Sequence, residues 1–122
     1  AIAYALHEEK RFNLTLTEVD LSEVGILNFE KPDLLKYPAL KLGFDVLEHG
    51  GLAGAAFNAA KEEALDNFLD YKLSFLGMAD VVRATMDDLS SKNQLSLDVE
   101  LEAVLEIDKE ARSIAKMFVD KF

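Results

Sequence analysis

The spacing of apolar residues predicts four helices in the C-terminal part of the chain. The first is expected over residues 38–49, because Pro38 suits a first helical turn and Gly50 ends the run. Its apolar side chains recur at helical spacing: Leu40, Phe44 and Leu47.

The next two helices differ in the size of their apolar residues. The second is expected over residues 52–70 and is rich in alanine, which combines high helix propensity with small volume and lets neighbouring helices approach closely. Its alanines are Ala53, Ala55, Ala56, Ala59, Ala60 and Ala64. The third follows a short link at residues 71–74, ends near Ser91, and carries a stripe of larger residues: Met78, Val81, Val82, Thr85 and Leu89.

The stretch before the C-terminal helix supports two interpretations. Residues 95–102, LSLDVELE, alternate strictly, and this period of two predicts a strand. The same region also fits a short helix through Leu101, Val104 and Leu105. Beyond it, Asp108 is expected to cap a final helix whose apolar stripe continues to the end of the chain: Ala111, Ile114, Ala115, Phe118 and Phe122.

Upstream of these helices the pattern changes. Residues 11–33 mix short alternating pieces with Gly25 and Pro32, which favours an extended connector that runs along a surface. The fold class is therefore expected to be mainly α, a small helical bundle of about four helices preceded by an extended connector segment. We place the connector at residues 1–36 and the bundle at residues 37–122. Residues 1–6 have neither an initiator methionine nor a helix cap, which indicates a fragment of a longer chain.

Charge and composition exclude several classes of function. The 122 residues carry 23 acidic and 13 basic side chains, a net charge of −10, which opposes binding to nucleic-acid phosphates. There is no cysteine, so disulfides, thiol nucleophiles and cysteine-bound metals are excluded. No apolar run approaches the roughly 20 residues of a membrane span, and no signal pattern opens the chain, so a soluble protein with no membrane or nucleic-acid partner is expected.

Residues with catalytic potential do not form a recognisable site. The histidines, His7 and His49, are in no Glu-x-x-His pair, and His49 suits a helix C-terminus. Residues 62, 63 and 66 place three carboxylates on the second helix, on a side expected to face solvent. Dinucleotide, Walker and nucleophile-elbow motifs are missing, although a weak phosphate site at residues 50–54 stays open. No catalytic, cofactor-binding or metal-binding residue is therefore predicted in this chain.

Two polar residues interrupt the apolar side of the second helix. We predict a structural role for both of them. Asn58 and Lys61 fall within the arc that holds the large apolar side chains, which are Phe57, Leu65, Phe68 and Leu69. Lys61 is expected to run its stem over apolar surface and reach a carboxylate or carbonyl with its ammonium. Asn58 is expected to bond backbone groups of a neighbouring segment.

Four stretches, in order along the chain, carry a resemblance to a known family. They are residues 2–6 (IAYAL), 27–51 (LNFEKPDLLKYPALKLGFDVLEHGG), 57–75 (FNAAKEEALDNFLDYKLSF) and 101–112 (LEAVLEIDKEAR). Together they resemble 1-deoxy-D-xylulose 5-phosphate reductoisomerase. The resemblance covers essentially the whole chain but only the last quarter to third of such an enzyme. Departures are Gly54 for a usual proline, Lys61 for a usual asparagine, and residues 8–11, which lack the usual proline.

The resemblance implies an oxidoreductase of the non-mevalonate route to isoprenoids as the parent protein. Enzymes of this family convert 1-deoxy-D-xylulose 5-phosphate into 2-C-methyl-D-erythritol 4-phosphate with NADPH and a divalent metal, Mg²⁺ or Mn²⁺. Their nucleotide, metal and substrate residues lie upstream of the matching region, so none carries over to this chain. The implied partners are the NADPH-binding and catalytic domains of the parent chain and a second copy in a homodimer. The implied location is the cytoplasm, or a plastid-type organelle in a eukaryote.

Two functions are consistent with these observations. The first is a C-terminal helical scaffold domain of the reductoisomerase, inactive as an isolated fragment. The second is a free-standing helical interaction module derived from that domain.

Overall fold

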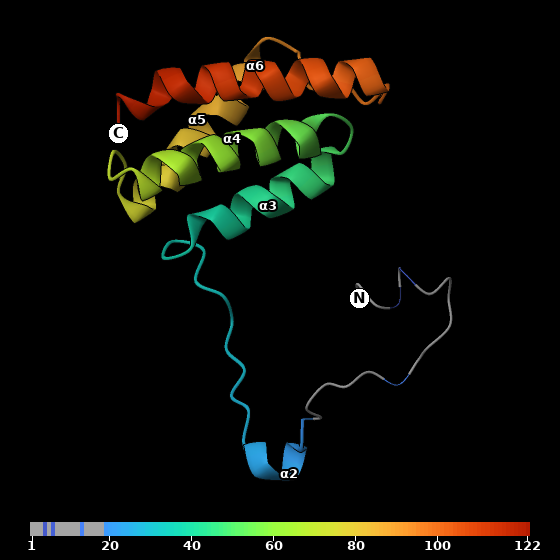
Figure 1. Cartoon of the computed structure of the whole chain (residues 1–122), viewed down its shortest axis with the longest axis vertical. Coiled ribbons are helices and arrows are strands. Elements are labelled where there is room, and N and C mark those ends of the chain that lie inside the picture. Colours follow the sequence, from blue (N-terminus) through green and yellow to red (C-terminus); the bar gives the residue numbers. More distant parts are fainter. Residues whose placement is uncertain (1–3, 5, 7–12, 14–18) are drawn as a thin grey trace. The chain divides into compact units, whose positions relative to one another are not determined.

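A computed structural model of the chain describes residues 4, 6, 13 and 19–122 (Figure 1). The chain divides into two units, residues 1–31 and residues 32–122, and each is described by itself. In the first unit, one helical turn, α2 (Leu21–Val24), begins at Asp20, whose carboxylate accepts a hydrogen bond from the backbone N–H of Ser22 at 2.8 Å. This turn interrupts the expected extended connector, of which residues 1–3, 5, 7–12 and 14–18 lie outside the described residues.

The second unit contains four longer helices, as the apolar spacing predicts. They are α3 (Pro38–His49), α4 (Ala53–Leu69), α5 (Phe75–Ser91) and α6 (Leu101–Val119). No strand occurs in the part of the chain that the structure describes. The expectation of a mainly helical bundle is therefore confirmed.

Local signals account for where three of these helices begin and end. Pro38 occupies the first turn of α3, and Gly50 follows its last residue with a φ of 73°. Ser74 caps α5, because its hydroxyl oxygen accepts a hydrogen bond from the backbone N–H of Gly77 at 3.0 Å. After α4 the chain turns at Tyr71, which has a φ of 59°.

The interpretation of residues 95–102 as a strand is wrong. Residues 94–100 form a loop, and α6 begins at Leu101 after the extended Glu100. Asp108, expected to start the last helix, instead lies inside α6. Its carboxylate pairs with Arg112 one turn later, at 2.9 Å from Nε, so an aspartate is well accommodated there without capping anything.

Helix α4 is the centre of the bundle. It packs against α6 and α5 and also contacts α3, whereas α3 and α6 do not touch each other. In Figure 1, α4 accordingly lies between α3 and α6. One face of the bundle is therefore built from α3, α4 and α5, and the opposite face from α6.

The buried face of α4 consists of its small residues. Five alanines are fully buried there: Ala53, Ala56, Ala59, Ala60 and Ala64. Against them pack the large buried side chains of the neighbouring helices, which include Val81, Leu89 and Ile114. Because alanines project so little, α5 and α6 come close to the α4 backbone, and the large apolar residues of α4 lie on its flank.

Helix α3 is apolar on two opposite sides. Leu42 and Val46 pack against the bundle, whereas the expected stripe of Leu40, Phe44 and Leu47 is exposed. No residue of α3 is fully buried. The spacing thus predicts the helix correctly but not the side that faces the core. No helix of the described residues is long and apolar enough to cross a membrane.

The turn between α3 and α4 is joined to the loop before α6. The backbone N–H of Leu52 donates to the carbonyl oxygen of Ser96 at 2.9 Å. Next to it, Gly51 has a φ of 55°, and a Cβ at this position would overlap that same carbonyl oxygen. Glycine is therefore required twice, for its backbone conformation and for the close approach of the two segments.

Candidate functional site

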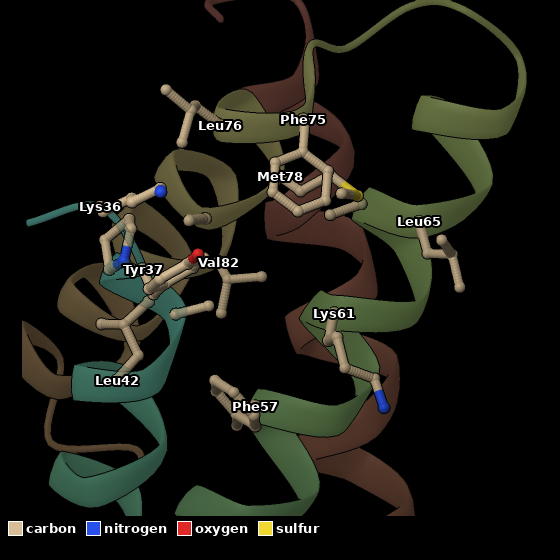
Figure 2. A pocket seen from close by; sticks show the side chains of 14 residues that line it. Lys36, Tyr37, Leu42, Phe57, Lys61, Leu65, Phe75, Leu76, Met78 and Val82 are labelled. Atoms are coloured by element: carbon tan, nitrogen blue, oxygen red, sulfur yellow. The ribbon is translucent and has the colours of Figure 1, made fainter. Parts of the chain in front are cut away.

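An apolar groove lies between α3, α4 and α5, with a volume of about 420 Å³. This volume falls in the range of small-molecule sites and of pockets that accept a protein side chain. Figure 2 shows its walls, to which each of the three helices contributes. The labelled side chains include Tyr37 and Leu42 at α3, Phe57 and Leu65 on α4, and Phe75, Leu76, Met78 and Val82 on α5.

The groove follows from the packing of α4. Since alanines fill its contacts with α5 and α6, the larger Phe57 and Leu65 lie on the flank of α4, where both border the groove. At the end where α4 turns into α5, the rings of Phe68 and Phe75 meet edge to face, with centroids 6.2 Å apart. Phe75 borders the groove, so this end of it is aromatic.

Two lysines border this groove. The ammonium of Lys36 lies 5.5 Å from the centroid of the Tyr37 ring, a cation–π distance. Lys61 directs its ammonium away from the apolar side chains, as Figure 2 shows, and donates to the side-chain oxygen of Asn58 at 3.0 Å. The groove thus has an apolar interior, and the Lys61 ammonium lies outside it, at the side chain of Asn58.

Asn58 and Lys61 are both exposed, because the arc that they share with Phe57 is the flank of α4 rather than its core face. The amide of Asn58 donates to the Glu62 side chain at 3.1 Å, one turn later in the same helix. This partner differs from the backbone group of a neighbouring segment that we expected. The structural importance of Asn58 and Lys61 stays a proposal.

A polar cluster of Arg112, Glu62 and Asp108 joins α4 to α6. Arg112 donates to Glu62 at 2.6 Å and, through Nε, to Asp108 at 2.9 Å. The hydrogen bond from Arg112, followed by that from Asn58, lowers the pKa of Glu62. The hydrogen bonds to Asp108 and then to Glu62 raise the pKa of Arg112. Arg112 therefore connects the polar edges of the two helices.

Glu63 corrects the expectation that the acidic residues of α4 all face solvent. The residue is buried, with only 9% of its surface exposed. Asn67 donates to its carboxylate at 3.0 Å, and the Lys116 ammonium lies 3.7 Å from it. Glu63 falls within the alanine face of α4, so burial is imposed by its place in the helix, and the two partners compensate for it.

The stability of the bundle should depend on the charge of Glu62 at acidic pH. Because the folded protein lowers the pKa of Glu62, the ionised carboxylate stabilises the fold at neutral pH, and this contribution is lost as the pH falls through the lowered pKa. Glu62→Gln should therefore lose less thermal stability than the parent chain between about pH 6 and about pH 3. Thermal melts followed by circular dichroism would measure this.

The matched control for that measurement is Glu106→Gln, at an exposed position of α6. No ion pair to Glu106 occurs among the described residues. Its acid dependence should follow that of the parent chain. Identical pH profiles for both variants would contradict the role assigned to the Arg112 hydrogen bond.

The acidic and histidine side chains do not gather into a metal site in the part of the chain that the structure describes. Within residues 4, 6, 13 and 19–122, no group of three or more His, Cys, Asp or Glu side chains could hold a metal ion. His49 is exposed at the end of α3, with Nδ1 3.4 Å from the Gly50 carbonyl oxygen, and His7 lies outside the described residues.

Comparison with known proteins places this helical domain in a family. The family model for the DXP reductoisomerase C-terminal domain matches residues 1–114. The 1-deoxy-D-xylulose 5-phosphate reductoisomerase of Jannaschia sp. (strain CCS1) is 47% identical over 116 residues, which are 94% of this chain and 30% of that protein. The Burkholderia mallei (strain SAVP1) enzyme is 41% identical over 120 residues, 98% of this chain and 29% of its own length.

Solved structures agree with this match. The reductoisomerase from Zymomonas mobilis in complex with NADPH is 33% identical, with a TM-score of 0.82 over 99% of this chain and 31% of that one. A DOX-P reductoisomerase with NADPH, fosmidomycin and magnesium is 34% identical, with a TM-score of 0.84 over 97% of this chain and 30% of that one. The fold therefore places this chain in the class of helical domains that form part of a longer protein. The chain belongs to the DXP reductoisomerase C-terminal domain family, and it spans about 30% of the length of these relatives.

Proposed function

We propose that this chain is the C-terminal helical scaffold domain of an NADPH- and metal-dependent 1-deoxy-D-xylulose 5-phosphate reductoisomerase of the non-mevalonate isoprenoid pathway. The observation that carries the proposal is the match to the C-terminal family over residues 1–114. In this proposal the catalytic centre and the sites for NADPH and the divalent metal belong to the upstream part of the parent protein. The isolated chain is then inactive.

The surface of the bundle supports a role within a larger protein. The groove residues Tyr37, Phe75 and Leu76 are exposed apolar side chains that lie around one cavity. Clustered apolar surface of this kind is typical of interfaces between domains or between proteins. A bundle that keeps such side chains on its outside is suited to hold another part of a protein in place.

The same proposal specifies partners and a location. The partners are the NADPH-binding and catalytic domains of the parent chain, with a second copy as a further partner in a homodimer. The location is the cytoplasm, in keeping with the bacterial relatives. The domain then acts by positioning the parts that react, rather than by touching the substrate.

The test is a chimera in which this chain replaces the matching C-terminal segment of the Jannaschia enzyme, assayed for NADPH consumption with 1-deoxy-D-xylulose 5-phosphate and Mg²⁺. We expect turnover from the chimera, and none above background from the 122-residue chain alone or from the Jannaschia enzyme truncated at the junction. A folded chimera no more active than the truncated enzyme would favour the free-standing interaction module. Turnover by the isolated chain would also contradict the proposal.

A further inference from the structure

The segment between α2 and α3 carries no regular structure at residues 27–32. These six residues are all exposed, and none of them makes a backbone hydrogen bond with another described residue. Figure 1 shows the segment as an uncoiled ribbon that leads toward α3. A segment of this kind can enter the cleft of another protein without first breaking a helix.

Endopeptidases are the proteins that recognise such a segment. They bind their substrates in an extended conformation, and they hydrolyse a bond inside a helix only while that helix is locally unfolded. Hydrolysis in a helix is therefore slowed by the small fraction of time that the helix is open. Residues 27–32 have no such barrier, because they have no helical hydrogen bonds to lose.

Phe29 indicates which class of endopeptidase fits the segment. Its side chain is 88% exposed, near the middle of residues 27–32. An exposed phenyl ring suits the apolar S1 pocket of chymotrypsin-like peptidases, which hydrolyse the bond that follows the residue in this pocket. The bond that fits is therefore the one between Phe29 and Glu30.

We propose that residues 27–32 are a processing site, at which an endopeptidase with an apolar S1 pocket hydrolyses the bond between Phe29 and Glu30. The C–N bond breaks, and water supplies the hydroxyl that completes the carboxylic acid of Phe29 and the hydrogen that completes the new amino group of Glu30. The C-terminal product, residues 30–122, keeps α3, α4, α5 and α6. It also keeps the core, since no described residue before Leu52 is buried. This modification site goes beyond the proposed function, because it requires neither a substrate nor a cofactor of the reductoisomerase.

Tyr71 is the competing aromatic residue. It is 96% exposed, so exposure alone predicts that hydrolysis after Tyr71 precedes hydrolysis after Phe29. Its conformation predicts the reverse. Tyr71 has a φ of 59°, which an extended substrate does not have, and its N–H donates to the carbonyl oxygen of Phe68 at 3.0 Å. The next N–H, that of Lys72, donates to the carbonyl oxygen of Asn67 at 2.9 Å.

Digestion of the 122-residue chain with dilute chymotrypsin tests the proposal, with the products followed over time by mass spectrometry. Hydrolysis after Phe29 should be at least about tenfold faster than hydrolysis after Tyr71. The product that begins at Glu30 should keep its helical circular dichroism and a cooperative thermal melt. Hydrolysis after Tyr71 at an equal or higher rate would overturn the proposal, and so would a product that has lost its cooperative melt.

Two matched substitutions test the role of the Phe29 side chain. Phe29→Asp puts a charge where an apolar pocket must be filled, and hydrolysis at this bond should become slower by about tenfold or more. Tyr71→Asp makes the same exchange at another exposed aromatic residue, where aspartate tolerates the positive φ, and it should change hydrolysis after Phe29 by less than about twofold. Unchanged hydrolysis after position 29 in the Phe29→Asp variant would overturn the assignment of this residue.

Discussion

Leu89→Ala is expected to destabilise the bundle by about 2–5 kcal/mol. Leu89 is fully buried among residues of α4 and α6, including Ala56 and Ile114. Its truncation removes apolar contacts and leaves a cavity that helices held by close packing cannot collapse to fill. Urea denaturation followed by helical circular dichroism would measure the loss, which is a large part of the roughly 5–15 kcal/mol that stabilises a typical domain.

Leu47→Ala supplies the matched control, since Leu47 is on the exposed side of α3. The same atoms are removed from a position already in water, so the change should stay within about 0.5 kcal/mol. Equal losses for the two variants would mean that Leu89 is not in a tightly packed core.

Adding volume to the buried alanine face of α4 should also destabilise the bundle, because it overpacks the core where Leu89→Ala leaves a cavity. Ala60 is fully buried and packs in the same cluster as Ala115 and Val119 of α6 and Val81 and Val82 of α5. Ala60→Leu therefore adds volume where two helices already approach the α4 backbone, and a cost of about 1–3 kcal/mol is expected from overpacking. Thermal and urea melts of the variant would measure it.

Ala39→Leu makes the same substitution at an exposed position of α3. It should leave the free energy of unfolding within about 0.5 kcal/mol of the parent value, because no neighbour has to move. An Ala60→Leu variant as stable as this control would show that α4 has room on its core face.

The helix boundaries of α3, α4 and α5 follow from sequence because their signals are local. Pro38, Gly50 and Ser74 act on backbone groups within one turn of themselves, so no knowledge of the fold is needed to interpret them. The core face of α4 does not follow in this way. Phe57 and Leu65 are more hydrophobic than any alanine, yet the fold buries the alanines, because close approach of two helices selects for small volume.

The predictions for residues 95–108 are wrong for two different reasons. An alternating pattern becomes a strand only when another strand pairs with it, and none is available among the described residues. Asp108 has the side chain of an N-cap, but an arginine one turn later gives it an ion-pair partner inside the helix as well.

The candidate site illustrates a similar limit. The pairing of Asp108 with Arg112 could have been inferred from their spacing, four residues apart in a helix. The contact of Arg112 with Glu62 could not, because it depends on how α4 and α6 are placed against each other. The groove was also missed, since it arises from the flank of α4, which the sequence pattern places in the core.

The close contact between Gly51 and Ser96 limits how this part of the protein can change in evolution. A larger residue at position 51 collides with backbone atoms, which cannot rotate away as a side chain would. A loop before α6 of altered length would in turn leave the buried N–H of Leu52 without its acceptor. Insertions and deletions in that loop, ordinarily a tolerant part of a protein, are therefore restricted by a turn far away in sequence, and the two segments must diverge together.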